Sequence, residues 1–517
     1  MEKMNRRKYR NPIIPGFYPD PSICRVGEDF YLVNSSFEYF PGVPIFHSKD
    51  LIHWRQIGHC LTRPSQLPLE NAWSSGGIYA PTIRYHQGKF YMVTTNVSYG
   101  GHFYVFTTDP AGQWSDPIWV KDHGKIDPSL FFDDDGTVYF TSQGPNGILQ
   151  SEIEIETGKI LTEPRVIWTG SCGKFPEGPH LYKFFGKYYL MVAEGGTEYG
   201  HLEAIGRSDN PWGPFEKCPH DPILTHRSFE SPIQATGHAD LGQDQVGNWW
   251  LVFLAVRPNG YPPCYHLGRE TFLAPVTWTE DGWPVVGLDG RVALEMEAEC
   301  LPEYAWEVEP GRDEFDRPLL RLDWNYLRNP EIENYSLTER PGWMRLRGSL
   351  ITLDQAGSPT FIGRRQREFS AKAATLVDFQ PEHEGEEAGL TVYMNERHHY
   401  EIGIIRSAGE RILFVRRRIG SLQAIVASLT APAGLVKLSI EADRDWYHFG
   451  FAAEGQPIQV VAKGETRYLS TEVAGKFTGV YLGLYATGNR VYSHAPADFD
   501  CFEMAFFTDV KENVWWS

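Results

Sequence analysis

Residues 20–33, DPSICRVGEDFYLV, combine a short motif with an apolar pair, a turn around Gly27 and an aromatic-rich run at 30–33. A turn of Gly or Asp between two strand-like runs is typical of a β-hairpin. The same phrase returns four times, at 80–83 (APTI), 127–130 (DPSL), 178–181 (GPHL) and 238–241 (HADL). Five such units, 47 to 60 residues apart and without helical periodicity between them, predict a five-bladed β-propeller. A β-sandwich with long loops is the alternative.

The register of this repeat predicts where the functional side chains lie. In a propeller the inner strand of each blade lines the central channel, so equivalent positions converge on the axis. That position holds Asp20, Asp127 and His238 in the first, third and fifth copies, and Ala80 in the second, while Glu177 stands one residue earlier in the fourth. Three acids and one histidine are therefore expected to meet. The alternative for any single acid is a solvated surface carboxylate.

The repeat stops near residue 300, where a polar, acidic segment at 302–313 has the composition of a linker. Beyond it, alternation of period two returns, for example at 436–440 (VKLSI). Such strands, about every ten to twenty residues, predict an antiparallel β-sandwich. The chain is thus expected to be all-β, with a propeller over residues 1–305 followed by a sandwich over residues 306–517 that packs on it.

The charge and the N-terminal segment restrict the partners and the compartment. A net charge of −18 argues against nucleic acid and against an anionic membrane surface as partners. The first residues are basic, but no apolar run of signal-peptide length follows them, and the seven cysteines occur singly. We therefore expect a cytoplasmic protein with reduced thiols. Whether it forms a homo-oligomer is left open by the sequence.

The residue types expected at the axis suggest hydrolysis of a glycosidic bond. That reaction needs one protonated carboxyl group and one ionised carboxylate, and a third carboxylate can raise the pKa of the acid by repulsion. Arg269, which follows the fifth copy, is a candidate for a bidentate hydrogen bond to sugar hydroxyls, or else for an ordinary ion pair. Phe37 and Tyr79 are candidates for stacking on a sugar ring, with core packing as the alternative.

The three acids lie in strings that resemble glycoside hydrolase family 43, namely residues 11–23 (NPIIPGFYPDPSI), 126–129 (IDPS) and 176–180 (PEGPH). The resemblance extends over the whole chain and implies a five-bladed propeller, with a C-terminal β-sandwich as in the longer members. It implies that Asp20 is the general base, that Asp127 tunes the acid and orients the substrate, and that Glu177 is the general acid.

Two further strings, 237–241 (GHADL) and 268–272 (GRETF), are similar to the β-xylosidase and α-L-arabinofuranosidase branch of the family. This resemblance implies an exo-acting, inverting hydrolase that releases terminal β-D-xylose from xylo-oligosaccharides. The alternatives are an α-L-arabinofuranosidase that removes arabinose from arabinoxylan oligosaccharides, or an enzyme with both activities. A cytoplasmic location would require that the substrate arrive already cut into oligomers.

The same resemblance implies that Arg269 binds sugar hydroxyls through hydrogen bonds. It also implies that His238 lies under the sugar, where it either holds a calcium ion through waters or acts as a cation itself. No cofactor is expected to be required, and Ca²⁺ near the axis is optional. One departure from the family is Tyr79, since many xylosidases have Trp there.

Two competing functions remain open at this stage. One is a carbohydrate-binding propeller without catalysis, and the other is a glycosidase of the sialidase or invertase kind, although no arginine triad typical of sialidases is found. A loop of the sandwich is expected to narrow the axial pocket to about one sugar, and the turn-rich segment 487–492 is the candidate.

Overall fold

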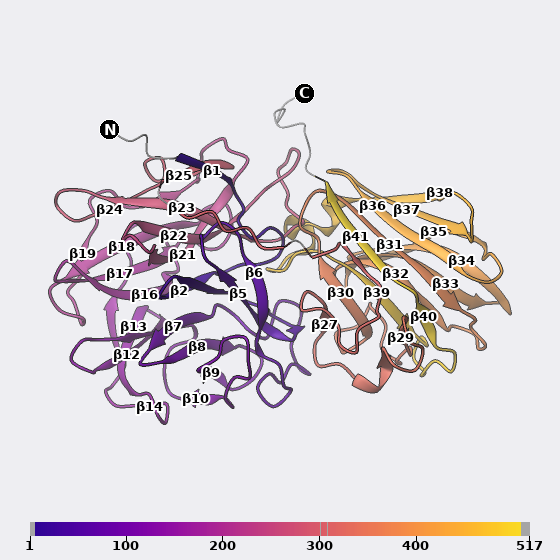
Figure 1. Ribbon diagram of the computed structural model, residues 1–517, viewed down its shortest axis with the longest axis horizontal. Coiled ribbons are helices and arrows are strands. Elements are labelled where there is room, and N and C mark those ends of the chain that lie inside the picture. Colours follow the sequence, from indigo (N-terminus) through magenta and orange to yellow (C-terminus); the bar gives the residue numbers. More distant parts are fainter. Residues whose placement is uncertain (1–5, 300, 308, 508–517) are drawn as a thin grey trace.

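The computed structural model describes residues 6–299, 301–307 and 309–507 of the chain. A propeller, coloured indigo to magenta, and a sandwich, coloured orange to yellow, lie side by side along the long axis (Figure 1). Within the described residues no helix is both long and apolar enough to cross a membrane.

Five separate antiparallel sheets form the propeller, which confirms the predicted number of blades. Their strands, in chain order, are β2 (Ser22–Val26), β3 (Asp29–Val33), β5 (Gly42–Ser48) and β6 (Arg55–Leu61) in blade 1; β7 (Thr82–His86), β8 (Lys89–Asn96), β9 (Gly101–Thr107) and β10 (Ile118–Val120) in blade 2; β11 (Ile126–Phe132), β12 (Val138–Gly144), β13 (Gly147–Glu154), β14 (Lys159–Ile160) and β15 (Arg165–Trp168) in blade 3; β16 (Glu177–Phe184), β17 (Lys187–Glu194), β18 (Leu202–Ser208), β19 (Glu216–Lys217) and β20 (Leu224–Thr225) in blade 4; and β21 (Gln234–Gln243), β22 (Trp249–Val256), β23 (Glu270–Trp278) and β24 (Pro284–Val286) in blade 5.

Apolar side chains fill the space between each pair of neighbouring blades. Blades 1 and 2 meet around Ile45 and Met92, and equivalent clusters lie between each later pair. A further cluster, which includes Leu32 and Val252, joins blade 5 back to blade 1. The ring is therefore closed by packing, and β1 (Arg6–Arg10) pairs with β25 (Glu295–Glu299) at its edge.

The inner strands begin with a local irregularity that aims side chains at the axis. Asp20, Asp127 and His238 have φ of 53°, 54° and 51°, and Gly178 has φ of 57°. The register of β11, β16 and β21 with their neighbours shifts at these positions. A bulged residue in the left-handed region turns the chain and re-aims its side chain, which is common beside functional sites.

The second domain is a sandwich of two antiparallel sheets, as predicted. The nine-stranded sheet consists of β26 (Arg312–Asp313), β28 (Tyr335–Ser336), β29 (Met344–Leu346), β31 (Ser370–Phe379), β36 (Val436–Ala442), β37 (Trp446–Ala453), β38 (Gln459–Glu465), β40 (Ala497–Phe499) and β41 (Phe502–Phe507). The eight-stranded sheet consists of β4 (Tyr39–Phe40), β27 (Asn325–Leu327), β30 (Thr360–Arg365), β32 (Glu387–Asn395), β33 (His398–Ser407), β34 (Glu410–Ile419), β35 (Leu422–Thr430) and β39 (Tyr481–Thr487). The helical elements are η1 (Ile332–Asn334), η2 (Thr466–Leu469) and α1 (Thr471–Ala474).

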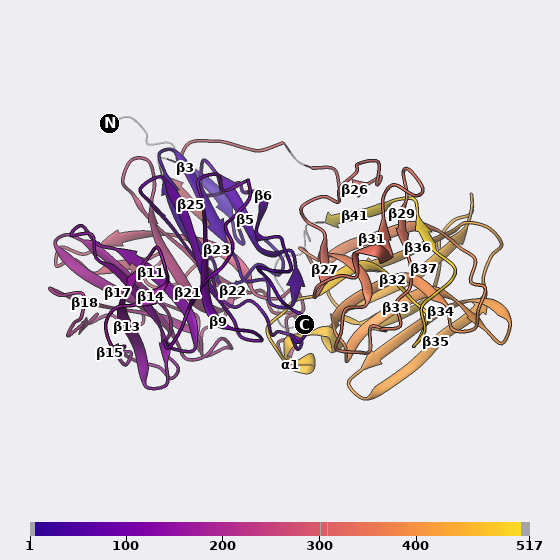
Figure 2. The same ribbon diagram turned by 90° about the horizontal axis from the view of Figure 1, so that it is seen from below.

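The two domains are joined by a strand and by a shared aromatic core. The short strand β4 belongs to the propeller sequence but pairs with β27 at the edge of the eight-stranded sheet. Around it, Phe17, Phe37 and Tyr39 of the propeller pack in one cluster with Tyr481 and Tyr485 of the sandwich. Figure 2 shows α1 at the same boundary. The predicted division at residue 305 falls in the connection between β25 and β26.

Candidate active site

The propeller axis brings together the side chains that the repeat register predicts. Asp20 precedes β2, Asp127 lies in β11, Glu177 begins β16 and His238 lies in β21. Asp20 is 4% exposed, Asp127 6% and His238 7%, whereas Glu177 is half-buried. The N–H of Gly178, the residue after Glu177, donates to Asp127, and the His238 ring lies 3.9 Å from Asp20, so these groups lie in one site.

Asp20 is held as a carboxylate by two donor side chains, Arg269 and Ser35. Arg269 donates from Nη1 to Oδ1 of Asp20 over 2.9 Å, and the Ser35 hydroxyl donates to Oδ2 over 2.5 Å. Burial would raise the pKa of Asp20, but the Arg269 guanidinium, then His238 and the Ser35 hydroxyl, hold it below its ordinary value. At neutral pH this carboxylate is therefore ionised and able to accept a proton.

Glu177 has the opposite electrostatic character. Burial, followed by repulsion from Asp20, raises the pKa of Glu177 to about 7, although Arg269 opposes the rise. The loop before it is fixed because Glu194 accepts the N–H groups of Ser171 and Cys172 over 2.6 and 2.9 Å. A carboxyl group with a pKa near neutrality can hold a proton and donate it.

Asp127 and Glu177 compete for the same proton. Burial and repulsion from Glu177 and Asp20 raise the pKa of Asp127 well above its ordinary value. However, the Gly178 N–H donates to Oδ2 of Asp127 over 3.2 Å, which favours the ionised form of Asp127. No such donor to Glu177 is seen among the described residues. Because both pKa values are raised, this pair of carboxyl groups holds a proton near neutral pH.

Arg269 lies immediately before β23 and forms the ion pair that was the alternative to a role in sugar binding. Besides Asp20, its Nη1 donates to the Thr197 hydroxyl over 2.9 Å. Its guanidinium carbon is 5.6 Å from the ring centroids of both Phe37 and Phe477. The side chain is 5% exposed, and its buried Nε has no hydrogen-bond partner within the described chain.

His238 lies beneath the carboxylates, but its surroundings do not fit a calcium ion. Burial, with Arg269 acting in the same direction, lowers the pKa of His238, which favours a neutral ring over a cation. Its Nδ1 is 3.9 Å from Oδ1 of Asp20, and that carboxylate is already paired with Arg269. Calcium takes about six to eight oxygen ligands. No group of three or more His, Cys, Asp or Glu able to hold a metal is found in the described ranges.

An aromatic wall lies beside the carboxylates. The ring of Phe37 is 5.2 Å from that of Tyr79 and 6.2 Å from that of Phe477, between centroids. Phe37 is 2% exposed and belongs to the interdomain core, whereas Tyr79 and Phe477 are half-buried. Tyr79 and Phe477 are therefore the aromatic groups that a sugar can contact, and Phe37 supports them from behind.

The sandwich approaches this wall through residues 475–480 and not through the predicted segment 487–492. The Phe477 N–H donates to the Ser75 hydroxyl over 3.0 Å, and the Val480 N–H donates to the His266 carbonyl over 3.0 Å. Asn489, by contrast, bonds to the Gly385 carbonyl within the sandwich. The prediction named the wrong end of β39, because segment 487–492 follows the strand and segment 475–480 precedes it.

Several residues of the site were not predicted from the sequence. They are Ser35, Thr197 and Phe477, which contact Asp20 or Arg269. The sequence holds only a weak indication of Phe477, namely the glycines Gly475 and Gly479 on either side of it. A Cβ at Gly479 would lie 2.4 Å from the Leu267 carbonyl oxygen, so glycine is needed where the two domains touch.

One ionised carboxylate and one protonated carboxyl group in a single pocket match the needs of glycosidic bond hydrolysis. Together with the five-bladed propeller and the attached sandwich, they define a glycoside hydrolase. Comparison with known sequences agrees, since the profile of glycosyl hydrolases family 43 matches residues 9–284. The profile of the beta xylosidase C-terminal Concanavalin A-like domain matches residues 312–505. The chain belongs to family 43.

Three relatives show how far the similarity extends. The non-reducing end alpha-L-arabinofuranosidase BoGH43B of Bacteroides ovatus is 48% identical over 509 residues, covering 96% of this chain and 95% of its own. A xylosidase/arabinosidase of Butyrivibrio fibrisolvens is 41% identical over 95% of this chain and 98% of its own. The solved structure of Bacteroides ovatus Xyloglucan PUL GH43B has a TM-score of 0.94 at 46% identity, covering 97% of this chain and 100% of its own. A non-catalytic propeller and a sialidase-like enzyme are therefore excluded.

Proposed function

We propose that this exo-acting family 43 hydrolase removes single terminal α-L-arabinofuranosyl residues from oligosaccharides. The observation that carries the proposal is its similarity to the α-L-arabinofuranosidase of Bacteroides ovatus along nearly the full length of both chains. This reverses the order expected from the sequence, where terminal β-D-xylose was the main prediction and arabinose the alternative.

In this proposal the three acids have separate roles. Asp20, whose pKa is held low, removes a proton from the attacking water, while Glu177 protonates the departing oxygen. Asp127 keeps the Glu177 carboxyl protonated by repulsion and is itself oriented by the Gly178 N–H. Attack by water on the face opposite the leaving group inverts the anomeric carbon.

Arg269 acts on both the base and the sugar. Its ion pair with Asp20 keeps the base ionised, and its remaining donors bind sugar hydroxyls. Since the group is fixed between Phe37 and Phe477, a hydroxyl bound to it has a defined position relative to Asp20. No step of this mechanism uses a metal.

The exo mode follows in this proposal from the segment 475–480. Phe477 stands beside Tyr79 and Arg269 at the site, so the sandwich narrows the space around the terminal sugar. A hydrogen bond from the Phe477 N–H to the Ser75 hydroxyl fixes this segment. An internal sugar, with chain on both sides, would need the space that this side chain fills.

The second candidate activity is release of β-D-xylose, supported by the name of the Butyrivibrio fibrisolvens relative. Both activities are tested with purified enzyme on 4-nitrophenyl α-L-arabinofuranoside and 4-nitrophenyl β-D-xyloside, and then on arabinose-decorated xylan and xyloglucan oligosaccharides. The proposal expects a higher kcat/KM on the arabinofuranoside and free arabinose from the oligosaccharides. A higher kcat/KM on the xyloside, with xylose as the released sugar, would establish the second candidate instead.

A further inference from the structure

The inner strands present side chains to the propeller axis in successive layers. Because alternate residues of a strand point to the same side, positions two apart follow one another along the axis. In blade 1, Asp20 belongs to the catalytic layer, Ser22 to the next and Cys24 to the third. In blade 5, His238 belongs to the first layer and Asp240 to the second. The site described above occupies only the first layer.

The second layer closes the channel with a buried hydrogen-bond network. Asp240 is fully buried and accepts bonds from the Ser22 hydroxyl at 2.6 Å, Arg84 Nη1 at 2.8 Å and the Tyr182 hydroxyl at 2.6 Å. Arg84 Nη2 also donates to Nδ1 of His180 over 2.9 Å. These residues come from blades 1, 2, 4 and 5, so the network separates the catalytic pocket from the opposite end of the channel.

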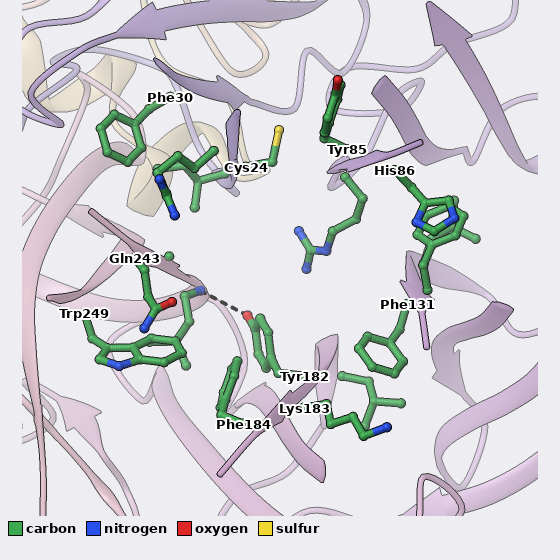
Figure 3. A pocket seen from close by; sticks show the side chains of 18 residues that line it. Cys24, Phe30, Tyr85, His86, Phe131, Tyr182, Lys183, Phe184, Gln243 and Trp249 are labelled. Carbon is green, nitrogen blue, oxygen red and sulfur yellow. Dashed lines mark hydrogen bonds between the residues drawn. The ribbon is translucent and has the colours of Figure 1, made fainter. Parts of the chain in front are cut away.

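The third layer opens into a second cavity of about 420 Å³, which has the size of a small-ligand site. Aromatic side chains from several blades form its walls, among them Tyr85, Phe131, Phe184 and Trp249 (Figure 3). Tyr85 is 39% exposed, at the rim. Gln243 lies beside Trp249, and its amide has no hydrogen bond to any other described residue. The cavity thus combines ring faces with an unused polar group.

Two of the three Arg and Lys side chains that line this cavity are already paired with carboxylates of the protein. Arg84 is paired with Asp240, and Lys183 is paired with Asp133 at 2.7 Å. Arg25, the third basic residue of the lining, is exposed and donates to the Gly27 carbonyl. Because the remaining cation is exposed to water, an ion pair with it would contribute little to binding. Hydrogen-bonding groups beside aromatic faces instead suit a neutral polyhydroxylated ring.

We propose that this cavity, at the end of the channel opposite the catalytic carboxylates, is a second site that binds one neutral sugar residue. The sugar lies against Trp249 with its hydroxyls bonded to the amide of Gln243. Occupancy of this site requires no hydrolysis, and it does not depend on which sugar the catalytic pocket releases.

The test uses the full chain labelled with ¹⁵N at tryptophan. The Trp249 indole N–H is assigned with Trp249→Phe, and its resonance is followed during titration with D-xylose and with L-arabinose. A saturable shift is expected, and Gln243→Ala should weaken the apparent affinity by about tenfold. The control is Leu288→Ala, because Leu288 is 64% exposed and does not line the cavity. It should leave the titration unchanged.

Two further probes decide the chemistry of the site. D-glucuronate should bind no better than the neutral sugars, and 4-nitrophenol should not reproduce their shift. The proposal is overturned if no neutral sugar gives a saturable Trp249 shift, or if Gln243→Ala and Leu288→Ala behave alike. Tighter binding of glucuronate would make the cavity an anion site, and an equal response to 4-nitrophenol would make it an unspecific aromatic site. Titration of the Asp20→Asn variant should give the same Trp249 curve, since the second layer separates the sites.

Discussion

Arg269 donates a hydrogen bond to Asp20 across 2.9 Å at the centre of the propeller, and both side chains are buried. The chain places these two residues at opposite ends of the propeller sequence, in blades 1 and 5, which are neighbours only because the ring closes. The pair explains how a buried carboxylate stays ionised beside two other carboxyl groups. It also links the proton acceptor to the group proposed to bind the sugar.

Replacing the proposed base should abolish activity on every substrate. Asp20→Asn keeps the shape of the side chain but cannot accept a proton, and general-base catalysis contributes about 10²–10⁴-fold. We expect a loss of kcat in that range on both nitrophenyl glycosides and natural oligosaccharides. Unfolding by denaturant should show an intact fold. If the loss is confined to poor leaving groups, Asp20 is not the base.

Replacing the proposed acid should have an effect that depends on the leaving group. A nitrophenolate departs without protonation, whereas a sugar alkoxide needs the proton of Glu177. Glu177→Gln should therefore reduce kcat on oligosaccharides by about 10²–10⁴-fold and on nitrophenyl glycosides far less. Comparison of the two substrate types measures the difference. Equal losses on both would contradict the assignment.

The pH dependence should identify the same residue. Because the pKa of Glu177 is raised to about 7, the group is protonated below that pH and loses its proton above it. The kcat/KM of the wild-type enzyme on oligosaccharides should fall as the pH rises through about 7. In Glu177→Gln this alkaline decline should disappear. Its persistence in the variant would assign it to another group.

Arg269 should influence the acid limb of the pH profile, where Asp20 becomes protonated. The guanidinium is the strongest of the groups that lower the pKa of Asp20, so Arg269→Gln should let that pKa rise. The acid limb of kcat/KM then moves to higher pH, and KM increases through lost sugar contacts. Arg269→Lys keeps the positive charge, so the acid limb should return toward its wild-type pH. The KM should recover less, because lysine cannot make the same contacts with the sugar. An unchanged acid limb in Arg269→Gln would show that the ion pair does not control the base.

The repeat in the sequence predicted which side chains meet at the propeller axis, because a repeat position has a fixed place in each blade. Asp20, Asp127 and His238 occupy one repeat position, and repeat symmetry converts that into convergence on the axis. Phe477 has no such symmetry, since its contact with Arg269 depends on how two domains dock. Period-two alternation also predicted half-buried strands, yet β32 and β39 are buried on both faces. The propeller covers the face that alternation alone assigns to solvent.

Phe477 should determine how many sugars leave in one step. Phe477→Ala removes the side chain beside Tyr79 and opens the space around the terminal residue. We expect kcat/KM to fall about tenfold through lost aromatic contact, and products longer than one sugar to appear. Chromatography of end-labelled oligosaccharides detects them. Val473→Ala, at an exposed position four residues earlier, is the control. Release of single sugars only by Phe477→Ala would assign the exo mode elsewhere.

The domain interface should be essential for the fold of the site. Tyr39 of the propeller and Tyr481 of the sandwich stack with ring centroids 4.0 Å apart, in the cluster that supports Phe37. Tyr481→Ala should lower the free energy of unfolding by about 3–5 kcal/mol, as for other buried aromatic residues, and reduce activity with it. The Tyr481 hydroxyl is buried without a partner among the described residues, so Tyr481→Phe should be neutral or stabilising. Denaturant unfolding of the two point variants measures both effects.

Truncation after residue 305 exposes the whole cluster and should abolish soluble activity. A soluble truncated propeller that still releases single sugars would show that the sandwich plays no part in the site.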